Sequence, residues 1–172
     1  QVCRLALQLF DELREPLGLT VVDRPLLEAA ALLHDVGYHI SYEQHHKHSY
    51  HLISHAMLPG FGASERRIIA AVARYHSGSL PKAKHEAMEG LDASDRRTVS
   101  RLAALLRVAD GLDRSHGARV SAVRAGVRKG RLTLTIEGRP PLDIELNAGE
   151  RKSDLLERES GLTVVLAESA GD

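Results

Sequence analysis

The hydrophobic period of this chain changes once, after Gly117, and this change divides its expected fold into two parts. Over 94–114, apolar residues recur at spacings of three and four, which is typical of a helix with a wide buried stripe. The same spacing predicts four earlier helices, over 1–14, 23–38, 49–58 and 65–75. The first part of the chain is therefore expected to be a bundle of helices.

After Gly117, apolar and β-branched residues alternate, as in half-buried strands. Strands are predicted over 120–127, 131–136, 142–146 and 162–166, and a short charged helix over 148–159. Because the chain has no tryptophan and only two phenylalanines, its core must consist of leucine, valine, alanine and isoleucine. We expect a mainly α fold, with a helical domain over 1–117 and a small strand-rich α/β appendage over 118–172.

The overall charge argues against two classes of partner. Twenty-three basic and twenty-three acidic residues cancel, so no global field attracts nucleic acid or an anionic membrane. No segment approaches the roughly 20 apolar residues that span a bilayer. The single cysteine, Cys3, excludes an internal disulfide and suits a reducing compartment. We therefore expect a cytoplasmic protein with neither a nucleic-acid nor a membrane partner.

Nine of the ten histidines lie between positions 34 and 85, which points to imidazole chemistry in this region. His34 and Asp35 end an Ala/Leu-rich helical run, and a buried carboxylate is costly unless a charge neutralises it. One interpretation is a cation over the helix end, and the alternative is a capped helix terminus. Imidazole and carboxylate ligands together suit Mn, Mg, Fe, Co or Ni. A structural zinc site would instead need cysteine thiolates, and the chain has no cysteine cluster.

Two further positions share this ambiguity. His76 follows the predicted helix 65–75, either as a metal ligand or as a cation favoured by the helix dipole. Asp110 lies within an apolar stripe, where a lone charge is expensive, so we interpret it as a ligand. The alternative for Asp110 is an ion pair with Arg107 or Arg114.

The polar loop 39–48 carries three more candidate imidazoles, His45, His46 and His48. One or two of them are expected to be metal ligands or phosphate contacts, and the others to be solvated.

Four blocks of sequence, taken in order, resemble the C-terminal half of the exopolyphosphatase / guanosine pentaphosphate phosphohydrolase family. They are ALLHDVGY at 31–38, HHKHSY at 45–50, IAAVARYH at 69–76 and LAALLRVADGLDR at 102–114. The order of His34-Asp35, His48, His76 and Asp110 also resembles the HD-domain metal-dependent phosphohydrolases. The early histidine of the HD pattern has no counterpart in residues 1–14, and the phosphatase half that precedes this region in the family is missing from this chain.

The resemblance implies an HD-type helical bundle that holds one or two divalent ions. The implied metal ligands are His34, Asp35, His48, His76 and Asp110, with Asp35 as a bridging, catalytic carboxylate. Lys47 and Arg114 are the implied catalytic cations that hold phosphate oxygens, and the alternative is that they are solvated surface charges.

Two functions follow as expectations. The first is metal-dependent hydrolysis of phosphate esters or anhydrides, with polyphosphate or guanosine polyphosphate as substrate. The second is a non-catalytic module that binds such an anion for the missing N-terminal phosphatase half. The appendage is in either case a candidate interface, with that half or with a second copy of the chain in a homodimer.

Overall fold

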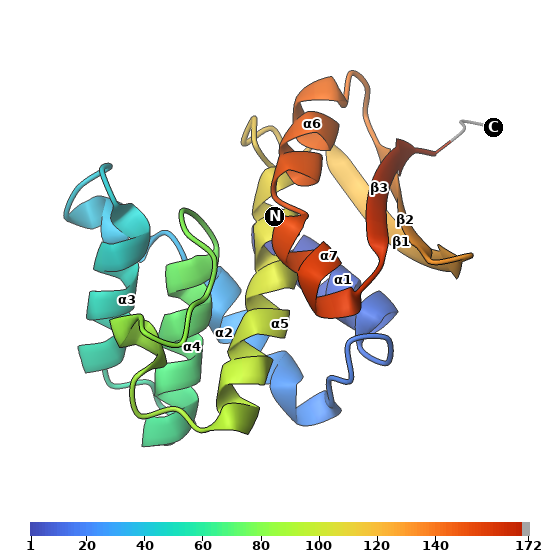
Figure 1. Cartoon of the computed structure of the whole chain (residues 1–172). Coiled ribbons are helices and arrows are strands. Elements are labelled where there is room, and N and C mark those ends of the chain that lie inside the picture. Colours follow the sequence, from blue (N-terminus) through green and yellow to red (C-terminus); the bar gives the residue numbers. More distant parts are fainter. Residues whose placement is uncertain (170–172) are drawn as a thin grey trace.

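A computed structural model describes residues 1–169, which contain seven α-helices, three 3-10 helices and three strands (Figure 1). The α-helices are α1 (Val2–Leu13), α2 (Arg24–Leu33), α3 (His45–His55), α4 (Ala63–Tyr75), α5 (Ala93–Gly111), α6 (Asp143–Arg151) and α7 (Asp154–Ser160). The strands are β1 (Val120–Arg128), β2 (Arg131–Gly138) and β3 (Thr163–Glu168), and the 3-10 helices are η1 (Val21–Asp23), η2 (Val36–His39) and η3 (Glu86–Met88). The expected mainly α fold with a small α/β appendage is confirmed.

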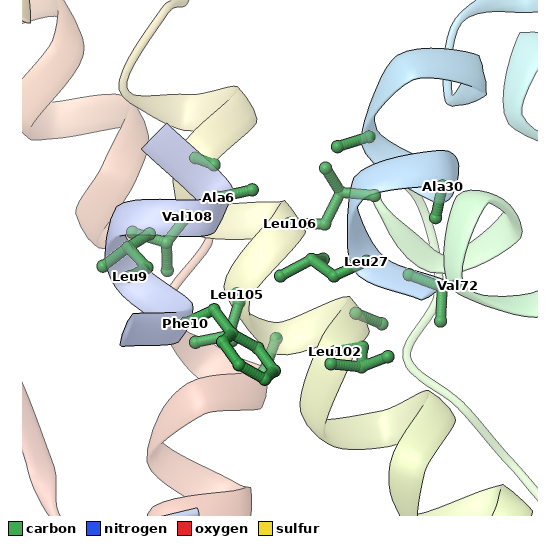
Figure 2. Packing of buried hydrophobic residues seen from close by; sticks show 14 of the residues in the cluster. Ala6, Leu9, Phe10, Leu27, Ala30, Val72, Leu102, Leu105, Leu106 and Val108 are labelled. Atoms are coloured by element: carbon green, nitrogen blue, oxygen red, sulfur yellow. The ribbon is translucent and has the colours of Figure 1, made fainter. Parts of the chain in front are cut away.

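Helix α5 is the element around which the others pack. Its N-cap, Asp92, accepts hydrogen bonds from the backbone of the first turn, and contacts extend from α5 to α1, α4, α6 and α7. Figure 2 shows Leu105 of α5 beside Phe10 of α1, while Leu106 faces Leu27 of α2. All four side chains are at most 1% exposed, so burial of the apolar stripe fixes the position of α5.

The C-terminal part is a three-stranded sheet in the order β1-β2-β3, with α6 and α7 joining β2 to β3. Strands β1 and β2 are antiparallel around the predicted Lys129-Gly130 turn, and β3 runs parallel to β2. Buried residues of the sheet and of α7 join the same hydrophobic cluster as α5. The division at 117/118 stays a prediction, and the last three residues of the appendage lie outside the described part.

The predicted strand 142–146 is wrong, because these residues form the N-cap and first turn of α6. The predicted helix 148–159 is in fact two helices, interrupted at Lys152 and Ser153. The buried positions Leu142, Glu145 and Gly149 follow the helical period, which places this face against α5. Among residues 1–169, no helix combines the length and the apolar content needed to cross a lipid bilayer.

Candidate metal centre

Side chains from four helix ends converge on one point. His34 and Asp35 follow directly after α2, and His76 follows directly after α4. His45 is the first residue of α3, and Asp110 lies in the last turn of α5. His76 is 1% exposed and His34 is 8% exposed, whereas the side chain of Asp35 is 32% exposed, so the centre is open to solvent on the side of Asp35.

The distances between donor atoms are short. Oδ2 of Asp35 is 3.2 Å from Nε2 of His34, and its Oδ1 is 3.4 Å from Nε2 of both His76 and His45. Nε2 of His45 is 3.0 Å from Nε2 of His76, and Oδ1 of Asp110 is 3.8 Å from Nε2 of His34. One ligand atom each from His34, Asp35 and His76 lies within 4.8 Å of the other two.

The three imidazoles are oriented in the same way. In each, Nδ1 lies within hydrogen-bond distance of the carbonyl oxygen three residues earlier, and because a carbonyl only accepts, Nδ1 carries the hydrogen. The pairs are His34 with Ala31 (2.8 Å), His76 with Ala73 (2.7 Å) and His45 with Tyr42 (3.3 Å). The neutral rings therefore present the lone pairs of their Nε2 atoms to the centre, as metal-binding histidines do.

With their hydrogens on Nδ1, the neutral rings of His45 and His76 bring no positive charge to the centre. Neither His45 nor His76 has an Nε2 hydrogen to donate when neutral, so two lone pairs face each other across 3.0 Å. Nε2 of His34 is buried and makes no hydrogen bond within the described residues. Ligands at about 2.0–2.2 Å from a divalent ion lie roughly 3 Å from their neighbours, which matches the separations here. The donor set fits a divalent ion.

The pKa shifts keep Asp35 and His76 in their ligating forms, whereas His34 without a metal is shifted toward the imidazolium. Burial opposes a charge on Asp35, but the His34 imidazole beside it prevails and lowers the pKa of the carboxyl. Burial likewise opposes a charge on His34, and the Asp35 carboxylate outweighs burial and raises its pKa. Burial, reinforced by the charge on His34, lowers the pKa of His76 to about 3. An ionised Asp35 and a neutral His76 are the forms that bind metal.

Gly37 and Ser49 join the His-Asp turn to α3. The Ser49 hydroxyl donates to the carbonyl of His34 (2.6 Å) and accepts from the backbone N–H of Gly37 (2.9 Å). A Cβ on residue 37 would lie 2.1 Å from the carbonyl oxygen of His45. Only glycine permits this approach, and the approach is what brings the His45 ring next to Asp35.

The structure brings His45, rather than His48, to the centre. Helix α3 begins at His45, after Gln44 in the left-handed conformation, four residues earlier than predicted. The Cβ of His48 faces Gly37, and among residues 1–169 His48 makes no ion pair with Asp35, whereas His45 does. The apolar periodicity does not reveal that the helix starts at His45, because the first turn of α3 is polar.

Asp110 is paired with Lys152, the residue that follows α6. This partner was not predicted, because nothing near Asp110 in the sequence indicates a residue of the appendage. The alternative partner Arg107 instead pairs with Asp154 (3.2 Å) and donates to the carbonyl oxygen of Tyr75 (3.3 Å). Asp110 therefore reaches the centre with a cation already beside it.

The two predicted phosphate-holding cations lie in different cavities. Arg114 lines a cavity of about 530 Å³ together with Ser77 and Lys152. This cavity adjoins the centre, because Ser77 follows His76 in the chain and Lys152 binds Asp110. Lys47 lines a separate cavity of about 510 Å³.

Comparison with known proteins gives one family. The family model for Ppx/GppA phosphatase, domain III, matches residues 1–148. A guanosine-5'-triphosphate,3'-diphosphate pyrophosphatase of Pseudoalteromonas translucida is 40% identical over 83 residues, 48% of this chain and 17% of the relative. A protein of the same name from Pseudoalteromonas atlantica is 35% identical over 77 residues, 44% of this chain and 15% of the relative. The chain thus matches less than a fifth of the length of either relative.

Proposed function

The chain belongs to the Ppx/GppA phosphatase family, and from this premise we propose that it is an HD-type domain that hydrolyses phosphate esters or anhydrides with a divalent ion. The observation that carries this proposal is the convergence of three imidazole Nε2 atoms on the carboxylate of Asp35. The proposed substrates are polyphosphate or guanosine polyphosphate. The second matches the substrate in the names of the two relatives.

The proposed ligands are His34, Asp35 and His76, with His45 in place of His48 and with Asp110 when Lys152 releases it. A divalent ion such as Mn, Mg, Fe, Co or Ni held by these residues would lower the pKa of a water and offset charge on the phosphate. The carbonyl oxygens bonded to the Nδ1 atoms hold the rings in place.

Substrate binding is assigned to the cavity beside the centre. Arg114 and Lys152 line it, and they donate charge-assisted hydrogen bonds to phosphate oxygens. Tyr38 stacks on the ring of His45, with centroids 4.2 Å apart, and covers that side of the centre. Together these residues would hold a phosphoryl group beside the metal centre.

A second candidate function is a non-catalytic module that binds a phosphate-rich anion. The observation that favours it is the ion pair between Lys152 and Asp110, because the ammonium group neutralises this carboxylate without a metal. In that case the His-Asp cluster is a structural feature, and the anion is delivered to another part of a longer protein.

The experiment compares divalent-ion binding and phosphate release for the wild type, Asp35→Asn and the control Glu43→Gln. Glu43 is an exposed acid on the loop before α3. Asp35→Asn removes a metal ligand and should weaken divalent-ion binding and hydrolysis by at least about a hundredfold. The Glu43→Gln control should match the wild type. Absence of stoichiometric metal binding by the wild type would refute the hydrolase proposal. Metal binding without phosphate release from either substrate would favour the second candidate.

A further inference from the structure

The break between α6 and α7 contacts α5 through two charged side chains. Both helices pack on α5 (Figure 1). Lys152, in the break, pairs with Asp110, and Asp154, the first residue of α7, pairs with Arg107. Arg107 and Asp110 are three residues apart on α5, so the two contacts lie on one face of this helix. The first contact is to a proposed metal ligand, and the second leads to another.

Arg107 holds the turn that carries His76. Its side chain is 7% exposed, and its Nη1 donates to the carbonyl oxygens of Tyr75 and Gly78, both at 3.3 Å. These two carbonyls flank His76 in the chain. The carbonyl of Tyr75 is also one of the last four of α4, which have no partner within the helix. One guanidinium therefore fixes the backbone from which the His76 ring points to the centre.

Asp154 fixes the orientation of this guanidinium. Its carboxylate accepts from Nε and Nη2 of Arg107, so these donors point to α7 while Nη1 points to the turn. The carboxylate also accepts from the backbone N–H of Leu155 (2.8 Å), which holds it at the start of α7. Without Asp154, the buried guanidinium would lose its charge partner and would no longer be held toward the turn.

We propose that Arg107 and Asp154 are positioning residues of the metal centre, and that the docking of α7 on α5 thereby sets the affinity of the centre for a divalent ion. Neither is a proposed ligand, and both act through the backbone of the turn 75–78 on Nε2 of His76. The effect on affinity rests on the proposed function, whereas the orientation of His76 requires no ion. Because coupling of binding free energies is reciprocal, a bound ion in turn stabilises the docking of α7.

Charge and positioning predict opposite effects of Arg107→Met on metal affinity. On charge alone, loss of a cation beside the centre would tighten the binding of a divalent ion. Because Arg107 positions His76, we expect instead that binding weakens by at least about tenfold, as is typical when the support of a metal ligand is lost. Asp154→Ala should weaken binding in the same direction, by about tenfold. Calorimetric titration of the whole chain with Mn²⁺ measures both changes.

Two controls separate positioning from other effects. Glu150→Ala removes an exposed acid of α6 that makes no ion pair within residues 1–169, and it should change Mn²⁺ affinity by no more than about twofold. Leu105→Ala removes a fully buried side chain of α5 and no bond to the turn. It lowers stability, but the folded protein should bind Mn²⁺ as the wild type does.

NMR of the metal-free chain in EDTA tests the positioning without an ion. The Nδ1 hydrogens of His34 and His76 each bond a carbonyl oxygen three residues earlier, but only His76 lies in the turn that Arg107 holds. In Arg107→Met, the Nδ1–H signal of His76 should therefore shift or broaden more than that of His34.

Two results would overturn the proposal. One is an Arg107→Met protein that binds Mn²⁺ as tightly as the wild type or more tightly. The other is a His76 signal that changes no more than the His34 signal. If the wild type binds no Mn²⁺, the hydrolase proposal fails, and the His76 signal alone then decides whether Arg107 positions this ring.

Discussion

Replacing Gly37 with alanine tests how the His-Asp turn is joined to α3. The added Cβ would lie 2.1 Å from the carbonyl oxygen of His45 and 2.5 Å from the backbone nitrogen of Ser49. Both are backbone atoms of α3 and cannot rotate aside as a side-chain tip can. The turn and the helix must therefore separate by roughly 1 Å to restore ordinary contact distances.

The magnitude follows from three effects. Overpacking of a close contact costs about 1–3 kcal/mol. Separation also weakens two hydrogen bonds of Ser49, to Gly37 and to His34, each worth about 1 kcal/mol. Alanine restricts the unfolded chain, which returns about 0.4–1 kcal/mol. The Gly37→Ala variant should therefore lose about 2–4 kcal/mol of unfolding free energy.

Urea denaturation followed by circular dichroism measures this loss as a lower midpoint at an unchanged slope. The matched control is Gly126→Ala, because a Cβ on Gly126 meets no atom within 4 Å and its φ is not positive. That control should change stability by no more than about 0.5 kcal/mol. A Gly37→Ala protein as stable as Gly126→Ala would refute the packing of the turn on α3.

Three further predictions concern α5 and its partners. Leu105→Ala removes a fully buried side chain and should cost about 2–5 kcal/mol in thermal or urea unfolding; a cost below 1 kcal/mol would contradict the core described here. Arg107→Met removes the pair with the half-exposed Asp154 and two bonds to carbonyl oxygens, and should cost about 1–3 kcal/mol in the same assay. Lys152→Met releases Asp110 and should tighten divalent-ion binding by roughly fivefold in calorimetry, whereas weaker binding would show that the lysine does not compete with the ion.

The bundle could be predicted because its helices carry long, regular apolar stripes. The predicted helix 94–114 corresponds to α5 at Ala93–Gly111. The segment 142–146 could not be assigned in the same way, because Leu142, Ile144 and Leu146 also alternate as in a strand. Burial in the structure follows the helical period instead and leaves Ile144 60% exposed. Over five residues both periods place apolar residues at the first and fifth positions, so the sequence alone does not separate them, and packing against α5 decides.

Some residues of the candidate site could be predicted from the sequence and others could not. His76 follows a helix that the sequence predicts, and His34 and Asp35 lie within the predicted helix 23–38, which in the structure ends at Leu33. Their convergence then needs only the packing of α2 on α4. His45 depends on a helix start that its polar sequence does not reveal. Lys152 lies 42 residues from Asp110, and only the docking of α6 on α5 brings the two together. Local patterns predict which side chains are available, and tertiary contacts select among them.

Pulsed EPR of the manganese-loaded chain tests most directly whether the imidazole Nε2 atoms and Asp35 share one cation. We predict one tightly bound Mn²⁺ per chain, with coupling to directly bound imidazole nitrogens. This coupling should fall in His76→Gln and remain in the control His55→Gln, because His55 is exposed at the far end of α3. A chain that binds no Mn²⁺ tightly, or binds it without imidazole coupling, would contradict the proposed centre.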